Sequence, residues 1–199
     1  MAISRLKQDK IEKLKNFAIK NGAEKVLTKY ISAKDILIPN WPHFKCLFGC
    51  DGYGASLCCP PFIPTPNEWR KFISEYNDAL IIGFNADANN FLRSLKKVNK
   101  ILIKLEREAF MLDLPKAFVL FAGSCMLCKK CVIHEKDFPK NIDPRIARRF
   151  CKHLRKARPS MEGIGIDVFA TLAKVGIKLH VLDISNFDKF RQFGLLLLD

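Results

Sequence analysis

The amino-acid sequence predicts an α/β fold: a small mixed sheet flanked by helices, with two cysteine-rich segments that bind metal. Two observations predict it. Strand-like apolar runs alternate with amphipathic helical patterns, and the cysteines gather at about residues 39–66 and 122–160. The chain has 199 residues, of which 49% are hydrophobic, so it has enough apolar side chains for one substantial core. We therefore expect a single domain over residues 1–199.

The first part of the chain is expected to supply one helix, two strands and a loop. Apolar side chains recur on one face over residues 8–21, which predicts a helix. β-Branched and apolar runs at 25–31 and 35–38 predict strands. The cysteine-rich segment 39–66 is also rich in proline and glycine, so we expect no regular hydrogen-bonded structure there.

The middle of the chain holds the clearest helical pattern. Thr65-Pro66-Asn67-Glu68 has the residue types of a capping box with proline at the first helical position, which predicts a helix to about Tyr76. Residues 79–84 and 117–121 are apolar runs that predict buried strands. Between them, apolar side chains repeat at alternating steps of four and three over residues 91–112, which predicts an amphipathic helix.

The last part of the chain continues the alternation of helices and strands. Asp143-Pro144 predicts the start of a basic helix that extends towards Lys156. A further helix over residues 160–175 and a strand over 178–184 follow. Arg158 and Ser160 stand where that further helix is expected to begin, so they either bind an anion or simply cap the helix.

The chain is strongly basic, and its charge is uneven. The formal net charge is +14, and residues 129–158 alone carry eleven Lys or Arg against three acids. Such a segment is either a solvated helix face or a docking surface for an acidic redox-protein partner. The N-terminal residues do not resemble a targeting signal, and the apolar runs are too short for a membrane helix. We therefore expect a cytoplasmic protein with no membrane segment.

The strongest chemical signal is the run Cys125-x2-Cys128-x2-Cys131, followed by Cys151. Structural disulfides are rare in a reducing compartment, so these cysteines indicate metal ligation. Three thiolates at this spacing with a remote fourth are typical of a [4Fe-4S] cluster. Zinc is the alternative, although structural zinc sites more often use separated pairs of ligands.

A second constellation lies in the segment 39–66, where Cys46 and Cys50 are followed by the adjacent pair Cys58 and Cys59. Neighbouring residues in an extended segment point to opposite sides, so we expect one cysteine of the pair to be spare. Three thiolates would leave one iron of a [4Fe-4S] cluster open to His43, to an outside ligand or to substrate. Alternatively, Cys58 joins as the fourth ligand, or the segment holds zinc or a redox-active pair of thiols.

These motifs and the residues around them resemble a known family, the cysteine-rich predicted metal-binding proteins of anaerobic prokaryotes (DUF2284-like). The resemblance spans nearly the whole chain. It implies metal binding, in iron–sulfur form, with Cys59 preferred over Cys58 as a ligand, and it implies no particular reaction. The residues that carry it are Cys46, Cys50, Tyr53-Gly54, Cys59-Pro60-Pro61, Cys125, Cys128, Cys131, Cys151, Ala157-Arg158-Pro159-Ser160-Met161-Glu162 and Gly165-Ile166-Asp167.

Three functions fit these features. The first is an iron–sulfur protein with two [4Fe-4S]-type clusters that transfers electrons to and from a redox partner. The second is a redox enzyme whose substrate binds at the open iron of the three-cysteine cluster. The third, ranked last because the chain has no recognised nucleic-acid motif, is a zinc-containing nucleic-acid binder suggested by the pI of about 9.5. Hydrolase, P-loop, Rossmann and zinc-protease motifs do not occur, and the sequence leaves open whether the protein is an enzyme.

Overall fold

A four-stranded antiparallel sheet forms the centre of the protein. The computed structural model describes residues 5–87, 89–139, 141–179 and 190–199. The sheet order is β1-β2-β4-β3, which confirms the predicted α/β class with a sheet flanked by helices. Each pair of hydrogen-bonded neighbours is antiparallel, and one isolated parallel bridge joins Phe121 to Ser160. The strands are β1 (Lys29–Ser32), β2 (Asp78–Asn85), β3 (Phe118–Leu120) and β4 (Arg191–Leu198).

The last strand in sequence occupies an interior position in the sheet. β4 pairs with β2 on one side and with β3 on the other, so that Leu195 lies opposite both Ile81 and Leu120. Because β2 and β3 are both antiparallel to β4, they run in the same direction. The long helix α4 (Phe91–Met111) connects them and crosses the face of the sheet, which makes a split βαβ unit.

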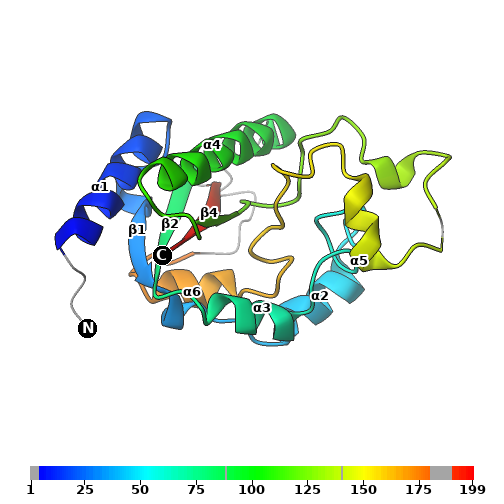
Figure 1. Ribbon diagram of the computed structural model, residues 1–199, viewed down its shortest axis with the longest axis horizontal. Coiled ribbons are helices and arrows are strands. Elements are labelled where there is room, and N and C mark those ends of the chain that lie inside the picture. The colour runs from blue at the N-terminus through cyan, green and yellow to red at the C-terminus, as the bar shows by residue number, and fades with distance from the viewer. Residues whose placement is uncertain (1–4, 88, 140, 180–189) are drawn as a thin grey trace.

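Helices cover both faces of the sheet, as Figure 1 shows. One face packs against α1 (Arg5–Lys20) and α4 through side chains such as Leu14 and Leu102, which are fully buried. The other face packs against α3 (Pro66–Ile73) and α6 (Val168–Ala173), with Trp69 and Leu172 in that core. Side chains of β2 and β4 alternate between the two cores, as expected for strands buried on both faces.

Both cysteine-rich segments lie at the end of the protein opposite α1 (Figure 1). They touch directly, since His134 Nε2 lies 3.0 Å from the carbonyl oxygen of Ala55. The first segment contains α2 (Trp41–Gly49), and the second contains α5 (Pro144–Ala147). Four short 3₁₀ turns complete the described elements: η1 (Lys25–Leu27), η2 (Ala33–Asp35), η3 (Val132–His134) and η4 (Arg148–Phe150).

Several predicted elements are confirmed. The helix predicted over residues 8–21 is α1, and the long helix predicted over residues 91–112 is α4. The capping box is present, because Thr65 Oγ1 accepts a hydrogen bond from the amide of Glu68, whose carboxylate accepts one from the amide of Thr65. The strands predicted at 79–84 and 117–121 are β2 and β3.

Four expectations about the cysteine segments and their surroundings are wrong. Residues 41–49 form a helix, because Pro42 stands in its first turn, where no intrahelical amide bond is lost. The predicted strand at 35–38 does not form, since the backbone of Leu37 bonds to Asp167 and Thr171 instead. The basic helix after Asp143 ends far short of Lys156, in the 3₁₀ turn η4.

The fourth wrong expectation is the helix over residues 160–175. Only α6 forms within that range. Gly165 has a φ of 96°, a left-handed conformation that interrupts a right-handed helix. Asp167 then caps α6 by accepting a hydrogen bond from the amide of Ala170. Most of the strand predicted at 178–184 lies outside the described residues. No strand was predicted where β4 forms.

Candidate metal centre

The eight cysteines are free thiols at the end of the protein where the two cysteine-rich segments meet. They fall into two groups, in which each thiol with a shifted pKa is influenced by cysteines of its own group more than by those of the other, although Cys59 is also influenced by Cys125. The α2 group comprises Cys46, Cys50 and Cys59. The loop group comprises Cys58, Cys125, Cys128, Cys131 and Cys151.

The α2 group combines one cysteine of a short helix with two that follow it in sequence. Cys46 and Cys50 are one turn apart, and their side chains hydrogen-bond to each other. Burial raises the pKa of Cys46 to about 11, and the neighbouring Cys50 and Cys59 raise it too. Burial likewise raises the pKa of Cys59, although a contact of 3.5 Å between its Sγ and the Ser56 Oγ opposes that shift. Crowding of thiols with raised pKa values would be relieved by a cation among them.

The loop group follows β3 and the basic turn η4. Burial raises the pKa of Cys128, and the electrostatic influence of Cys131, Cys125 and Cys151 adds to the rise. Cys125, Cys131 and Cys151 are therefore near enough to Cys128 to influence it electrostatically, and all four are cysteines that the sequence predicted to share one cluster.

Cys58 lies apart from the α2 group. It is 4% exposed, and its thiol hydrogen-bonds with that of Cys125. This bond, together with burial, raises the pKa of Cys58, and it lowers the pKa of Cys125 to about 7. The adjacent residues Cys58 and Cys59 thus face different groups, and the structure brings Cys58 to the loop group.

Arg148 supplies positive charge to the loop group. Its charge lowers the pKa of both Cys58 and Cys125. Its Nη2 donates hydrogen bonds to the carbonyl oxygens of Leu154 and Ala157, at 3.1 and 2.8 Å. Its Nη1 is buried and has no hydrogen-bond partner among the described residues. A buried guanidinium N–H that has no partner and lies beside thiols can donate a hydrogen bond to an anionic group held by those thiolates.

Several other predicted site residues have structural roles. His43 lines a small cavity of about 100 Å³ with Thr65 and Arg70, and no cysteine lines that cavity. Arg158 pairs with the carboxylate of Glu106 and lies over the ring of Phe118. Ser160 Oγ accepts a hydrogen bond from the amide of Gly163. Arg158 and Ser160 are therefore engaged within the protein, but Ser160 caps no helix, because the helix expected to begin there does not form and Asp167 caps α6 instead.

A large cavity borders the α2 group. Its volume is about 810 Å³, and Cys46 and Cys50 are part of its wall. Glu162 also lines it, and the charge of Glu162 influences Cys46. Desolvation by the surrounding protein raises the pKa of Glu162, although the residue as a whole is exposed. Sequence reasoning singled out no role for Glu162, and the only signal was its place next to Ser160 and Met161 in the motif that carries the family resemblance.

Comparison with known proteins decides the family. The family model described as "Predicted metal-binding protein (DUF2284)" matches residues 29–198. This chain belongs to that family. No curated protein and no solved structure matches the chain. Family membership supports metal binding in general, and it confirms the resemblance stated from the sequence.

The residues of the site fit a soft metal. Thiolates select zinc or iron–sulfur clusters, and the eight free thiols provide such a donor set, with the buried Nη1 of Arg148 as a hydrogen-bond donor beside them. Within the described residues, no three His, Cys, Asp or Glu side chains are placed closely enough to hold a single metal ion.

None of the described helices has the length and apolar character needed to cross a membrane.

Proposed function

We propose that this member of the DUF2284 family binds two iron–sulfur clusters of the [4Fe-4S] type and transfers electrons to and from a redox partner. The observation that carries the proposal is the division of the cysteines into two adjoining groups. Cys59 interacts electrostatically both with Cys50 of its own group and with Cys125 of the loop group, so the two groups are close neighbours. A [4Fe-4S] cluster accepts and returns single electrons, and its potential depends on surrounding charge and hydrogen bonds.

The loop group would hold one cluster. Cys125, Cys128, Cys131 and Cys151 provide the four thiolates that such a cluster requires. Cys58 then acts from outside the ligand set, as a buried thiol that donates a hydrogen bond to Cys125. Arg148 offsets the negative charge of the thiolates, which raises the reduction potential and favours retention of the cluster.

The α2 group would hold the other cluster through Cys46, Cys50 and Cys59. Three thiolates leave one iron without a cysteine from this group. His43 and Cys58 were the candidates for the fourth position; His43 lines a separate small cavity, and Cys58 interacts with Cys125 of the loop group. In this proposal the fourth position takes an external ligand.

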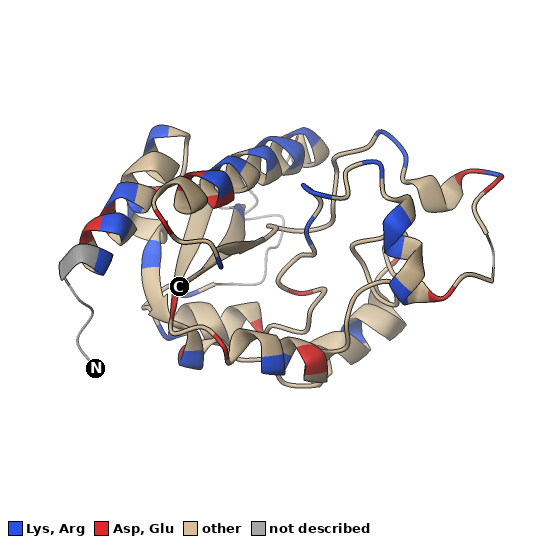
Figure 2. Cartoon of the chain, viewed as in Figure 1, with Lys and Arg blue, Asp and Glu red and all other residues tan. Residues whose placement is uncertain are grey.

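The redox partner would dock on the surface around α5 and η4. Three apolar side chains are exposed there: Ile146 at 53%, Phe150 at 45% and Leu154 at 49%. The same stretch of chain contains the basic residues Arg145, Arg149 and Lys152, of which Arg145 pairs with Glu68 and Lys152 with Glu135. Figure 2 shows basic positions on α5 and its neighbouring loops. An apolar patch within a basic rim suits a partner with an acidic rim, because opposite charges speed association while the apolar contact provides affinity.

Metal analysis of anaerobically purified protein tests the proposal. Two clusters require about eight iron and eight acid-labile sulfide per chain. The variant Cys131→Ser should lose the iron of one cluster, whereas Cys58→Ser, at a cysteine of the same group outside the proposed ligand set, should keep both. Colourless protein with stoichiometric zinc would overturn the proposal and favour the zinc alternative. Equal iron loss in both variants would overturn the assignment of Cys58.

A second candidate function is redox catalysis at the α2 group. The cavity of about 810 Å³ favours it, because the cavity reaches Cys46 and Cys50 but none of the loop cysteines. An open coordination position next to a cavity is suited to binding substrate. The expected signature is a change in the electron paramagnetic resonance signal of one cluster when cyanide is added, with the other signal unchanged. Two unresponsive signals would favour the electron carrier alone.

A further inference from the structure

The cavity beside the α2 group has the walls of a small-molecule site. Its volume of about 810 Å³ falls within the range typical of ligand pockets. Its walls come from segments far apart in the chain and include five aromatic side chains, which can stack on a flat ring. The aromatic residues are Trp41, Phe91, Phe169, Phe190 and Phe193.

Basic side chains are the main charged groups of the cavity. Lys45, Lys178 and Arg191 line it, and Glu162 is the one acid among the lining residues. None of these three bases forms an ion pair with another described residue. The walls therefore carry an excess of positive charge that the described part of the protein does not neutralise.

A buried amide provides a further donor. Gln192, at the start of β4, is 3% exposed and lines the cavity. Its Oε1 accepts a hydrogen bond of 3.2 Å from Ser94 Oγ, so Nε2 is the free end of the amide. Nε2 is buried and has no partner among the described residues. Buried donors are normally satisfied, so Nε2 of Gln192 is available to an acceptor from beyond the described residues, such as a ligand in the cavity.

We propose that the cavity binds an aromatic carboxylate, with its ring against the aromatic walls and its carboxylate near the basic side chains. Arg191 can hold a carboxylate with two parallel hydrogen bonds, and a lysine adds a point charge. The inference rests on the second candidate function, because it names the substrate class for the same site. The binding itself depends on side chains of the cavity, so it can be measured whatever metal the cysteines hold.

Isothermal titration of anaerobically purified protein with 1-naphthoate tests the inference. The comparison ligands are 1-naphthylmethanol, which is neutral, and 1-naphthylmethylamine, which is cationic. We expect 1-naphthoate to bind at least about tenfold more tightly than either. Equal affinities would overturn the role of the basic side chains, and failure of all three to bind would overturn the cavity as a ring-binding site.

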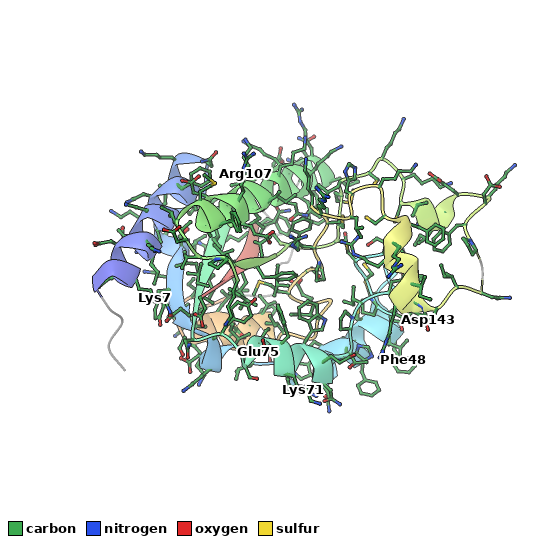
Figure 3. All side chains as sticks on the ribbon, in the orientation of Figure 1. Lys7, Phe48, Lys71, Glu75, Arg107 and Asp143 are labelled. Atoms are coloured by element: carbon green, nitrogen blue, oxygen red, sulfur yellow. The ribbon has the colours of Figure 1, made fainter. Side chains whose placement is uncertain are left out.

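Two variants with matched controls place the binding. Val168→Phe fills the cavity and should weaken 1-naphthoate binding by about tenfold or more. Val26→Phe introduces the same change at a side chain that is 69% exposed and does not line the cavity, so it should bind as the wild type does. Arg191→Gln should bring the affinity close to that of the neutral analogue. Arg107→Gln, at an exposed position on α4 (Figure 3), should not.

Iron and sulfide content, measured on the same samples, separates the two proposals. Protein that contains both clusters and has no affinity for 1-naphthoate would refute the proposed substrate class. The proposal that the protein binds two clusters would not be affected. Protein with zinc in place of iron that still binds 1-naphthoate through Val168 and Arg191 would refute the clusters and support the cavity site. Unchanged binding in Val168→Phe would refute the location.

Discussion

Replacing Glu106 with alanine should destabilise the protein strongly, because its carboxylate joins three parts of the chain. Glu106 lies on α4. Its Oε2 accepts hydrogen bonds from the amide of Val119 in β3, at 2.7 Å, and from Nε of Arg158, at 3.0 Å. Its Oε1 pairs with Nη2 of Arg158, and the two side chains are only 18% and 16% exposed. The pair therefore ties the helix and the sheet to the segment that follows Cys151.

The expected loss of stability follows from what remains when the carboxylate is removed. Breaking a buried ion pair by removing one partner costs about 3–5 kcal/mol, because the other charge stays buried. An unsatisfied buried amide adds about 1–3 kcal/mol. Arg158 retains bonds to the carbonyl oxygens of Arg155 and Ala157, and the site is partly accessible, so the sum must be discounted. We expect about 3 kcal/mol.

Urea unfolding followed by circular dichroism measures this loss. The matched control is Glu108→Ala on the same helix, which should change the free energy of unfolding by less than about 0.5 kcal/mol. The variant Glu106→Ala should also retain less iron, since Arg158 helps to fix the chain beyond Cys151. If both variants lose the same small amount of stability, the reasoning about the Glu106–Arg158 pair is wrong.

Three further predictions concern packing, charge and pH. Gly83→Ala would drive a new methyl group into the side chain of Leu27 and should cost about 1–3 kcal/mol in thermal or urea unfolding, whereas Gly49→Ala meets no neighbouring atom and should cost far less. Arg148→Gln should weaken metal retention about tenfold in a chelator competition, while Arg149→Gln, at an exposed position, should not. Burial raises the pKa of Tyr76 to about 12, so its contribution to stability is full below pH 10 and is lost as the pH rises through about 12. The stability difference between wild type and Tyr76→Phe should therefore shrink between pH 9 and pH 12, and a constant difference would contradict this assignment.

The parts of the fold that sequence reasoning predicted correctly are those with a local cause. The repeat of apolar residues fixes α4, and the pair Thr65 and Glu68 fixes the start of α3. β4 was missed because its run of leucines lacks both alternation and β-branching, and its place between β2 and β3 depends on partners far away in sequence. The strand expected at 35–38 failed for the same reason: its backbone partners lie in the segment 167–171.

The candidate site was predicted in composition but not in arrangement. Spacing alone indicated that Cys125, Cys128 and Cys131 act together, and in the structure Cys125, Cys131 and Cys151 all influence Cys128 electrostatically. The placement of Cys58 against Cys125 could not be foreseen, because it depends on how two loops meet. The cavity was invisible in the sequence, since its walls come from segments that only the folded sheet brings together.

The interior position of β4 sets an order of events during synthesis. All eight cysteines leave the ribosome before residues 191–198, yet β2 and β3 have no shared partner until that strand arrives. The nascent chain thus carries exposed thiols for as long as its sheet is incomplete. Thiols that are exposed before the sheet is complete can be oxidised or can bind the wrong metal, so the position of β4 prolongs the stage of folding at which both reactions compete with correct metal binding.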